Sequence, residues 1–233
     1  MKNLFTDIEF SSSTLDRYFV RTSISKSLTK MAPNFRGKLL DAGCGEMPYK
    51  STILNNFNVT EYVGLDIEGA LDYNSIVKPD FEWDGVTMPF ADNTFDTVLA
   101  TEVLEHCPQP LVYLSEACRV LKPTGKIIFT VPFLWTLHEV PHDEHRYTPF
   151  ALQRLFKESG FKESTILPLG GYDASLAVML GLWINRHRGT SLLDKILRKI
   201  LMPIIRKLIA IDLPTADFKE GSMYTGFYGF AEK

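Results

Sequence analysis

Residues 39–49 read LLDAGCGEMPY. An apolar run that ends in two closely spaced glycines, Gly43 and Gly45, is typical of a first β-strand followed by a tight turn over a ligand. The dinucleotide-binding fingerprint requires Gly or Ala at position 48, where this chain has Pro48. The stretch therefore predicts a nucleotide-type site at the C-terminal end of a first strand, and it weakens an NAD-dependent interpretation.

Apolar runs alternate with helical patterns on either side of this stretch, as in a parallel sheet with crossover helices. We predict strands at residues 38–43, 61–67, 97–102, 126–133, 163–171 and 226–233. We predict helices within residues 11–31, within 109–125 before Pro123 and Gly125, and from the N-cap Thr148 with Pro149 to Gly160.

Composition limits the class of protein. The 233 residues are 45% apolar and 23% charged, which is the balance of a globular domain with a large core. A net charge of −3 argues against a protein that wraps nucleic acid with its whole surface. Cys44, Cys107 and Cys118 form no C-x-x-C pair, so they suggest neither a disulfide framework nor a zinc site. With no signal-peptide pattern and no spanning apolar run, we expect a cytoplasmic protein.

Four motifs follow one another at suitable intervals: LLDAGCG, GLDI, MPFADNTFDTVLATEVLEH and RVLKPTGKIIFTVPF. In this combination the chain resembles the class I S-adenosylmethionine-dependent methyltransferases, and more narrowly the type 11 methyltransferase-domain group. The resemblance covers about residues 39–133 and continues more weakly to about residue 161. It implies an α/β, Rossmann-like, doubly wound fold with a mostly parallel seven-stranded sheet, and S-adenosyl-L-methionine as the cofactor.

The resemblance also assigns cofactor-binding residues. Each of them lies at the end of a predicted strand or in the turn that follows it. Asp41, Gly43 and Gly45 would line the methionine portion, Asp66 would hold the ribose, and Asp84 with Gly85 would lie by the adenine, while Thr101 and Glu102 would close the site. Ile67 is a further cofactor-binding residue. The alternative for the aspartates is a role as helix caps or turn formers.

The histidine-rich segment 137–150 raises a different chemistry. His138-Glu139-Val140-Pro141-His142 fits the H-E-x-x-H pattern of zinc proteases, which needs a continuous helix. Pro141 disfavours that helix, and the segment directly follows a predicted core strand. We therefore predict a loop at the ligand-binding edge of the sheet, with no metal site.

This loop is the predicted acceptor site. His138 and His142 are candidate general bases, with Glu139 orienting one of them, while Arg146 would bind an anionic substrate group. The further candidate substrate contacts are Tyr147 and, from the VLEH motif, His106. Two alternatives stay open: a loop held together by its own hydrogen bonds and salt bridges, and a metal bound by His138, His142, Asp143 or His145, which the spacing does not support.

A basic segment precedes the last predicted strand. Residues 181–211 contain seven lysines and arginines but one acid, Asp194, and apolar pairs recur at helical spacing with an interruption at Pro203. The segment is either a lid that packs on the domain or on a partner subunit, or an interfacial helix on anionic lipid at the inner face of the membrane. We expect no nucleic-acid binding, because stacking aromatic residues are missing. A monomer and a homodimer both remain open.

We accordingly divide the chain into an N-terminal helical segment (1–36), a methyltransferase core (37–171), a basic amphipathic helical insertion (172–222) and a last core strand (223–233). The predicted reaction moves a methyl group from S-adenosylmethionine to a small-molecule, glycan or lipid-linked acceptor. Oxygen is the expected target, since TEVLEH stands where nitrogen-methylating enzymes often have a D/N-P-P-Y type motif. The alternatives are a non-catalytic S-adenosylmethionine-binding regulator, an NAD-dependent oxidoreductase and a zinc hydrolase.

Overall fold

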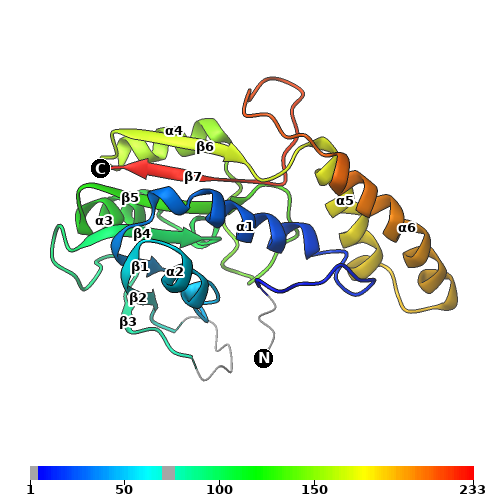
Figure 1. Ribbon diagram of the computed structural model, residues 1–233, viewed down its shortest axis with the longest axis horizontal. Coiled ribbons are helices and arrows are strands. Elements are labelled where there is room, and N and C mark those ends of the chain that lie inside the picture. Colours follow the sequence, from blue (N-terminus) through cyan, green and yellow to red (C-terminus); the bar gives the residue numbers. More distant parts are fainter. Residues whose placement is uncertain (1–4, 70–76) are drawn as a thin grey trace.

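The computed structural model describes residues 5–69 and 77–233. One seven-stranded sheet with the order β3-β2-β1-β4-β5-β7-β6 forms its centre (Figure 1). The strands are β1 (Gly37–Ala42), β2 (Val59–Ile67), β3 (Phe81–Trp83), β4 (Phe95–Thr101), β5 (Leu121–Pro132), β6 (Glu163–Pro168) and β7 (Gly226–Glu232). Strand β7 runs antiparallel to β5 and β6, whereas the neighbouring strands among β1 to β5 are all parallel. The predicted Rossmann-like, mostly parallel sheet is confirmed.

The strand order reverses between β1 and β4, which lie side by side in the sheet. From β1 the chain moves outward to β2 and β3, and it then returns to start again at β4. Ligands of open α/β sheets bind at such a switch point, outside the C-terminal ends of the strands. The turn after β1 therefore lies where the sequence predicts the cofactor site.

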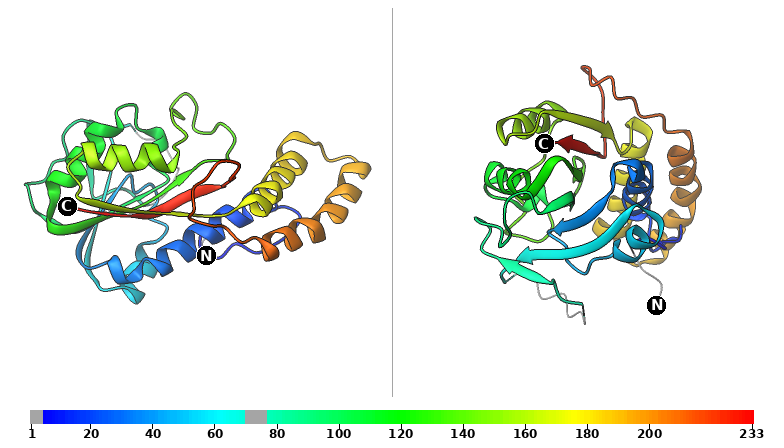
Figure 2. Two further views of the ribbon diagram at one scale, coloured as in Figure 1. Left: turned by 90° about the horizontal axis from the view of Figure 1, so that it is seen from above. Right: turned by 60° about the vertical axis from the view of Figure 1, so that its left-hand side comes forward.

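Helices cover both faces of the sheet (Figures 1 and 2). They are α1 (Tyr18–Lys30), α2 (Lys50–Asn56), α3 (Pro110–Val120), α4 (Pro149–Glu158), α5 (Tyr172–Leu182) and α6 (Leu192–Ile211), with short helical turns η1 (Ala32–Asn34), η2 (Leu104–His106) and η3 (Trp183–His187). Among the described residues, none of these helices is long and apolar enough to cross a bilayer.

An apolar core lies on each face of the sheet, because successive side chains of a strand point to opposite sides. In β1, Leu39 packs with α1 and α2 residues, whereas Leu40 packs with α3 and α4 residues. Strand β5 repeats the alternation with Ile127 and Ile128. All four side chains are fully buried, so the parallel strands read as continuous apolar runs rather than alternating ones.

Local signals place several elements correctly. The Thr148 side chain accepts a hydrogen bond from the Ala151 N–H at the start of α4, as expected of an N-cap. Strand β5 begins at Leu121, earlier than predicted, with an irregular pairing before Lys126. The short elements α2 and β3 were not predicted, since neither is long enough to show a periodic pattern.

Helices α5 and α6 form a hairpin that extends beyond the end of the sheet (Figure 2). A capping box between Ser191 and Asp194 starts α6, and the helix continues through Pro203, where the sequence indicated an interruption. The hairpin has its own small core, which Leu15 from the N-terminal segment completes together with residues such as Ile205.

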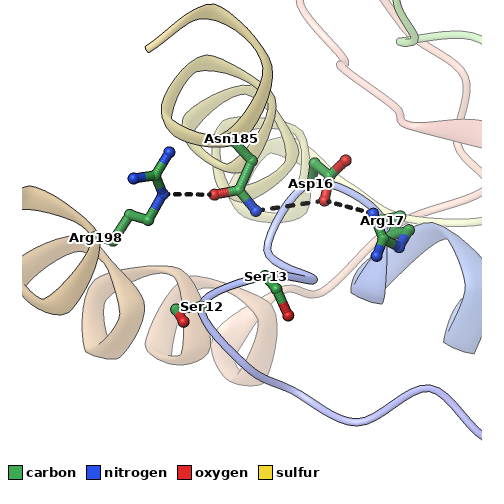
Figure 3. A pocket seen from close by; sticks show the side chains of 6 residues that line it. All are labelled: Ser12, Ser13, Asp16, Arg17, Asn185 and Arg198. Atoms are coloured by element: carbon green, nitrogen blue, oxygen red, sulfur yellow. Dashed lines mark hydrogen bonds and ion pairs between the residues drawn. The ribbon is translucent and has the colours of Figure 1, made fainter. Parts of the chain in front are cut away.

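Polar contacts also attach the N-terminal segment to this hairpin. Asp16 is 4% exposed and accepts hydrogen bonds from Asn185 and from Arg186, whose Nε lies 3.0 Å from its carboxylate. Arg198 in turn donates to Asn185 (Figure 3). The shallow pocket in this view is lined by residues of both segments, among them Ser12. The hairpin is thus joined to the domain through side chains rather than through the sheet.

Candidate functional site

The turn after β1 requires its glycines. Gly43 and Gly45 have φ angles of +96° and +48°, which other residues adopt only under strain. A Cβ atom on Gly43 would lie 2.6 Å from the Val103 side chain. The turn therefore lies directly against the segment that follows β4, and the two segments form neighbouring walls of one site.

Asp41, in β1, has an unsatisfied oxygen. Its carboxylate is 2% exposed, and Oδ2 accepts a hydrogen bond from the Tyr62 hydroxyl. Within the described part of the chain, Oδ1 is buried and has no hydrogen-bond partner. Burial raises the pKa of Asp41 to about 7. A buried acceptor without a partner is unfavourable, so this position suits a ligand that brings a donor or a positive charge.

Asp66 lies at the end of β2 and faces the glycine turn. Its Oδ2 accepts the Gly45 N–H at 2.8 Å, and its Oδ1 accepts the N–H of Ile67 at 2.8 Å. Burial raises the pKa of this carboxyl group. Each carboxylate oxygen can accept a further hydrogen bond, so an oriented carboxylate is available for a pair of hydroxyl groups.

The predicted adenine residues lie beside the end of β2. Ile67 is 47% exposed and pairs in register with Trp83 of β3. A Cβ atom on Gly85 would lie 3.3 Å from Ile67 Cδ1. Asp84 is exposed, and its Oδ1 accepts the N–H groups of Val86 and Thr87, which lower its pKa. Asp84 thus shapes a turn, while Ile67 offers an open apolar surface.

The end of β4 adds a further acid to the site. Thr101 is half-buried and pairs with Thr130 of β5. The Thr130 hydroxyl donates to Glu102 Oε1 at 2.8 Å, and burial raises the pKa of Glu102. Glu102 has a φ of +54°, a backbone conformation that non-glycine residues adopt mostly where the surroundings enforce it.

The segment between β5 and α4 is a loop, as predicted. It contains no helix between Pro132 and Pro149. The two imidazoles of the H-E-x-x-H pattern consequently do not lie one turn apart on a helix face, which is the arrangement a zinc protease needs. The zinc-hydrolase interpretation therefore loses its structural basis.

Arg146 holds this loop together. Its two terminal nitrogens donate to the two oxygens of the Asp143 carboxylate at 2.6 and 2.8 Å, and they also contact backbone oxygens of His145 and Thr136. Asp143, with a side chain only 1% exposed, also lies 3.2 Å from His138 Nδ1. The guanidinium group holds the pKa of Asp143 well below its usual range. Arg146 is thus engaged within the loop in this structure, and its contact with a substrate stays a prediction.

Two more of the predicted acceptor residues have other contacts in this structure. Tyr147 is 5% exposed, and its hydroxyl donates to the Leu104 carbonyl at 2.8 Å, so it belongs to the core rather than to an acceptor surface. Glu139 does not orient His138 or His142; its carboxylate lies 3.6 Å from His106 Nε2 instead. His142 is exposed, and its backbone carbonyl contacts His106 Nδ1 at 3.0 Å. The loop therefore brings His106 and His138 together, with ring centroids 4.8 Å apart.

Sequence reasoning missed two residues of this region. Tyr62 binds Asp41 from the middle of β2, where an aromatic residue gives no signal beyond strand propensity. Glu105 is fully buried, and in the described structure both of its carboxylate oxygens have no hydrogen-bond partner. Its spacing of three residues from Glu102 was the available signal, because such a spacing places two side chains on one side of a helical turn.

Comparison with known proteins agrees with this geometry. Residues 40–129 match the family model described as a methyltransferase domain. A fatty-acid O-methyltransferase of Mycolicibacterium smegmatis is 31% identical over 126 residues, which cover 51% of this chain and 45% of that protein. A sterol 24-C-methyltransferase of Gibberella zeae is 34% identical over 116 residues, covering 44% of this chain and 29% of that protein. The chain thus spans less than half the length of these relatives.

Solved structures show a similar fold over most of the chain. A methyltransferase from Archaeoglobus fulgidus that depends on S-adenosylmethionine superposes with a TM-score of 0.56 at 16% identity, covering 90% of this chain and 93% of that one. The sheet order, with its switch point between β1 and β4, defines a Rossmann-like fold. More narrowly, residues 40–129 match a methyltransferase domain, and the fold is the one found in S-adenosylmethionine-dependent methyltransferases.

The cofactor of this class is S-adenosyl-L-methionine, and the residues present fit it. The unpartnered Oδ1 of Asp41 suits the ammonium group, since a buried carboxylate oxygen needs a donor. The glycine turn allows a ligand to approach the backbone closely, and Asp66 points its carboxylate at that turn. The exposed face of Ile67 suits a flat aromatic base.

Proposed function

We propose that this protein transfers the methyl group of S-adenosylmethionine to an oxygen atom of a small-molecule, glycan or lipid-linked acceptor. The observation that carries the proposal is the buried, unpartnered Oδ1 of Asp41 beside the glycine turn. Bound there, the cofactor would supply an electrophilic methyl group on a sulfonium. An NAD-dependent oxidoreductase fits less well, because this pocket contains Pro48 where a pyrophosphate needs close helix packing.

The chain's own residues would bind and align the reactants. Asp41 and Gly43 hold the amino-acid end of the cofactor, Asp66 the ribose, and Thr101 with Glu102 close the pocket after β4. Methyl transfer is an in-line displacement, so alignment contributes much of the rate enhancement. Asp84 and Gly85 would position the adenine edge through the turn that they form.

An oxygen acceptor needs a group that takes its proton. His138 and His142 remain the candidates in the loop before α4. The exposed imidazole of His142 is available to solvent and substrate, whereas His138 is oriented by Asp143 at 3.2 Å. Burial lowers the pKa of His138, which favours the neutral imidazole that a base requires. His106, whose ring lies 4.8 Å from that of His138, would contact the acceptor beside these histidines.

A peripheral membrane contact through residues 181–211 forms part of the proposal. The outer side of α6 carries exposed apolar side chains that recur at helical spacing, including Ile196, Ile200 and Ile204. The exposed lysines and arginines of α6 are Lys195, Lys199, Arg206 and Lys207. An amphipathic helix with this pattern suits an anionic lipid surface, where apolar side chains insert and lysines meet the headgroups.

Such a contact fits a lipid-linked or lipid acceptor and a location on the inner face of the membrane. The fatty-acid and sterol methyltransferases among the relatives act, by their names, on lipids. A lid or a homodimer contact is the competing use of the same helix face. With a membrane contact, the insertion at 172–222 would help to bind the acceptor, while residues 37–171 and 223–233 would bind the cofactor.

The test is product formation. Purified full-length protein is incubated with S-adenosylmethionine and acceptor sets, namely fatty acids, sterols, lipid-linked sugars and soluble glycans, with and without anionic vesicles. S-adenosylhomocysteine is quantified after each incubation. Formation with one set, absent in the Asp66→Ala variant, supports the proposal. Tight cofactor binding with no product in any set favours the non-catalytic regulator.

A further inference from the structure

The cluster that the proposed function leaves unexplained lies between the turn η2 and the loop before α4. One donor atom from each of Glu105, His106 and His138 lies within 4.8 Å of the others. Glu105 comes from the η2 turn with a fully buried carboxylate. Neither of its oxygens has a hydrogen-bond partner among residues 5–69 and 77–233. A native fold seldom leaves both oxygens of a buried carboxylate unsatisfied unless a ligand or ion contacts them.

In each of the two histidines, an oxygen acceptor lies within hydrogen-bond distance of Nδ1. His106 Nδ1 lies 3.0 Å from the His142 carbonyl oxygen, which can only accept, so this nitrogen carries the proton. His138 Nδ1 lies 3.2 Å from the Asp143 carboxylate and is a donor for the same reason. With the proton on Nδ1, the Nε2 atom of each neutral tautomer is left as the acceptor. Metal-binding histidines usually show this pattern, with the non-ligating N–H donated to a carbonyl or carboxylate.

The free nitrogen of His106 lies near two carboxylates and near the His138 ring. His106 Nε2 lies 3.8 Å from Glu105 Oε1 and 3.6 Å from Glu139 Oε2. The His106 and His138 rings are 4.8 Å apart at 68°. Metal–ligand bonds of about 2.0–2.2 Å separate neighbouring donors by about 3–4 Å, so small rotations of these side chains would close the site. Arg146 donates two hydrogen bonds to the Asp143 carboxylate, at 2.6 and 2.8 Å, and so fixes the loop that carries His138.

We propose that Glu105, His106 and His138 bind a divalent transition-metal ion, with Glu139 as a fourth ligand. Two imidazoles with carboxylates suit zinc, manganese, iron or cobalt better than calcium or magnesium, which prefer oxygen ligands alone. The sequence predicted no metal site, because Pro141 disfavours the helix on which the H-E-x-x-H pattern of His138 and His142 depends. The proposed ligand set instead combines Glu105 and His106 with His138, which lies 32 positions after His106 in the sequence.

The role of the ion rests on the proposed function. Val103, which touches the glycine turn, precedes Glu105 by two residues, so the ion lies beside the cofactor pocket. An acceptor hydroxyl bound to the ion has a lowered pKa. Its proton leaves to His142 or to water, the oxygen forms a bond to the methyl carbon, and the carbon–sulfur bond breaks with its electron pair on sulfur. In this arrangement His138 acts as a ligand and not as the base.

The experiment measures metal content of the purified full-length chain. The protein is stripped with a chelator, loaded separately with Zn²⁺, Mn²⁺ or Co²⁺, desalted and analysed by mass spectrometry of the metal. We expect about one equivalent of at least one ion in the unmodified protein, and at least a tenfold lower affinity in His106→Gln and His138→Gln. The control His142→Gln removes an imidazole from the same loop and should retain the ion. Circular dichroism verifies that each variant is folded.

A content below about a tenth of an equivalent for all three ions would overturn the proposal, and so would wild-type content in His106→Gln and His138→Gln. Loss of the ion from His142→Gln would contradict this ligand assignment. Titration of the metal-free protein with S-adenosylmethionine separates the two claims. Cofactor binding without metal binding removes only the metal site, whereas metal binding without cofactor binding removes only the methyltransferase function.

Discussion

Asp66 accepts the backbone N–H of Gly45 at 2.8 Å. This contact joins the end of β2 to the glycine turn after β1, so the Asp66 carboxylate shapes the turn at which we propose that the cofactor binds. We predict that Asp66→Ala lowers S-adenosylmethionine affinity by at least tenfold, since it removes the ribose acceptor, and destabilises the fold by about 1–2 kcal/mol through the unsatisfied N–H. Calorimetric titration and urea unfolding measure the two effects. Unchanged affinity would show that Asp66 does not contact the cofactor.

The pKa of Asp41 predicts a pH dependence. Burial raises it to about 7, above the value of about 3.9 for an unfolded chain. The folded state therefore binds the extra proton between these values, and the stability that this provides is complete below pH ~4 and is lost as the pH rises to about 7. A ligand ammonium favours the ionised carboxylate instead. Cofactor affinity should accordingly increase with pH and level off above about 7.

Asp41→Asn provides the control for that profile. The amide does not titrate, so we expect weaker binding at pH 8 and a flatter dependence of the affinity between pH 5 and pH 8. Titration calorimetry at several pH values gives both curves. Identical slopes for the two proteins would mean that another group is responsible.

The glycine turn predicts a third result. Gly43 combines a φ of +96° with a Cβ position 2.6 Å from Val103, whereas Gly69 has a φ of +73° and open space around it. Gly43→Ala should destabilise the fold by about 2–4 kcal/mol through backbone strain and overpacking. Gly69→Ala should cost about 1 kcal/mol from strain alone. Equal losses in urea unfolding would argue against the close approach of Val103.

The exposed face of α6 predicts vesicle binding. Ile196 and Ile200 are 47% and 54% exposed, so their replacement by Asp should leave the fold intact while opposing insertion into lipid. We expect the double variant to sediment severalfold less with vesicles that contain anionic lipid, and wild-type binding to fall at high salt. Phe150→Asp, at an exposed position of α4, should bind as wild type does. A change in molecular mass of the Ile196/Ile200 variant would identify a subunit contact instead.

The sequence predicted those parts of the site that follow from strand ends. Gly43, Gly45, Asp41 and Asp66 come directly after or within two apolar strands, and parallel strands place such residues at one edge. The loop at 138–142 was also predictable, because Pro141 opposes a helix. The contacts within this loop were not predictable. Arg146 forms an ion pair with Asp143, and the charge of an arginine alone does not show whether it binds a neighbouring acid or a substrate.

Burial was the least predictable property. Tyr147 and Glu105 both look like surface residues of a polar segment, yet both are buried. The Tyr147 hydroxyl contacts Leu104, and the backbone of Glu105 accepts two N–H groups from the loop. These contacts join segments about 40 residues apart, and their register depends on how the loop folds over η2. Local periodicity carries no information about such a long-range pairing.

We propose that S-adenosylmethionine binds at the C-terminal ends of β1, β2 and β4. The most direct test of this central claim is calorimetric titration of the purified protein with S-adenosylmethionine and, separately, with NAD. We predict saturable binding of about one S-adenosylmethionine per chain, loss of that binding in Asp66→Ala, and no saturable heat with NAD. Binding of NAD with no response to S-adenosylmethionine would contradict the account.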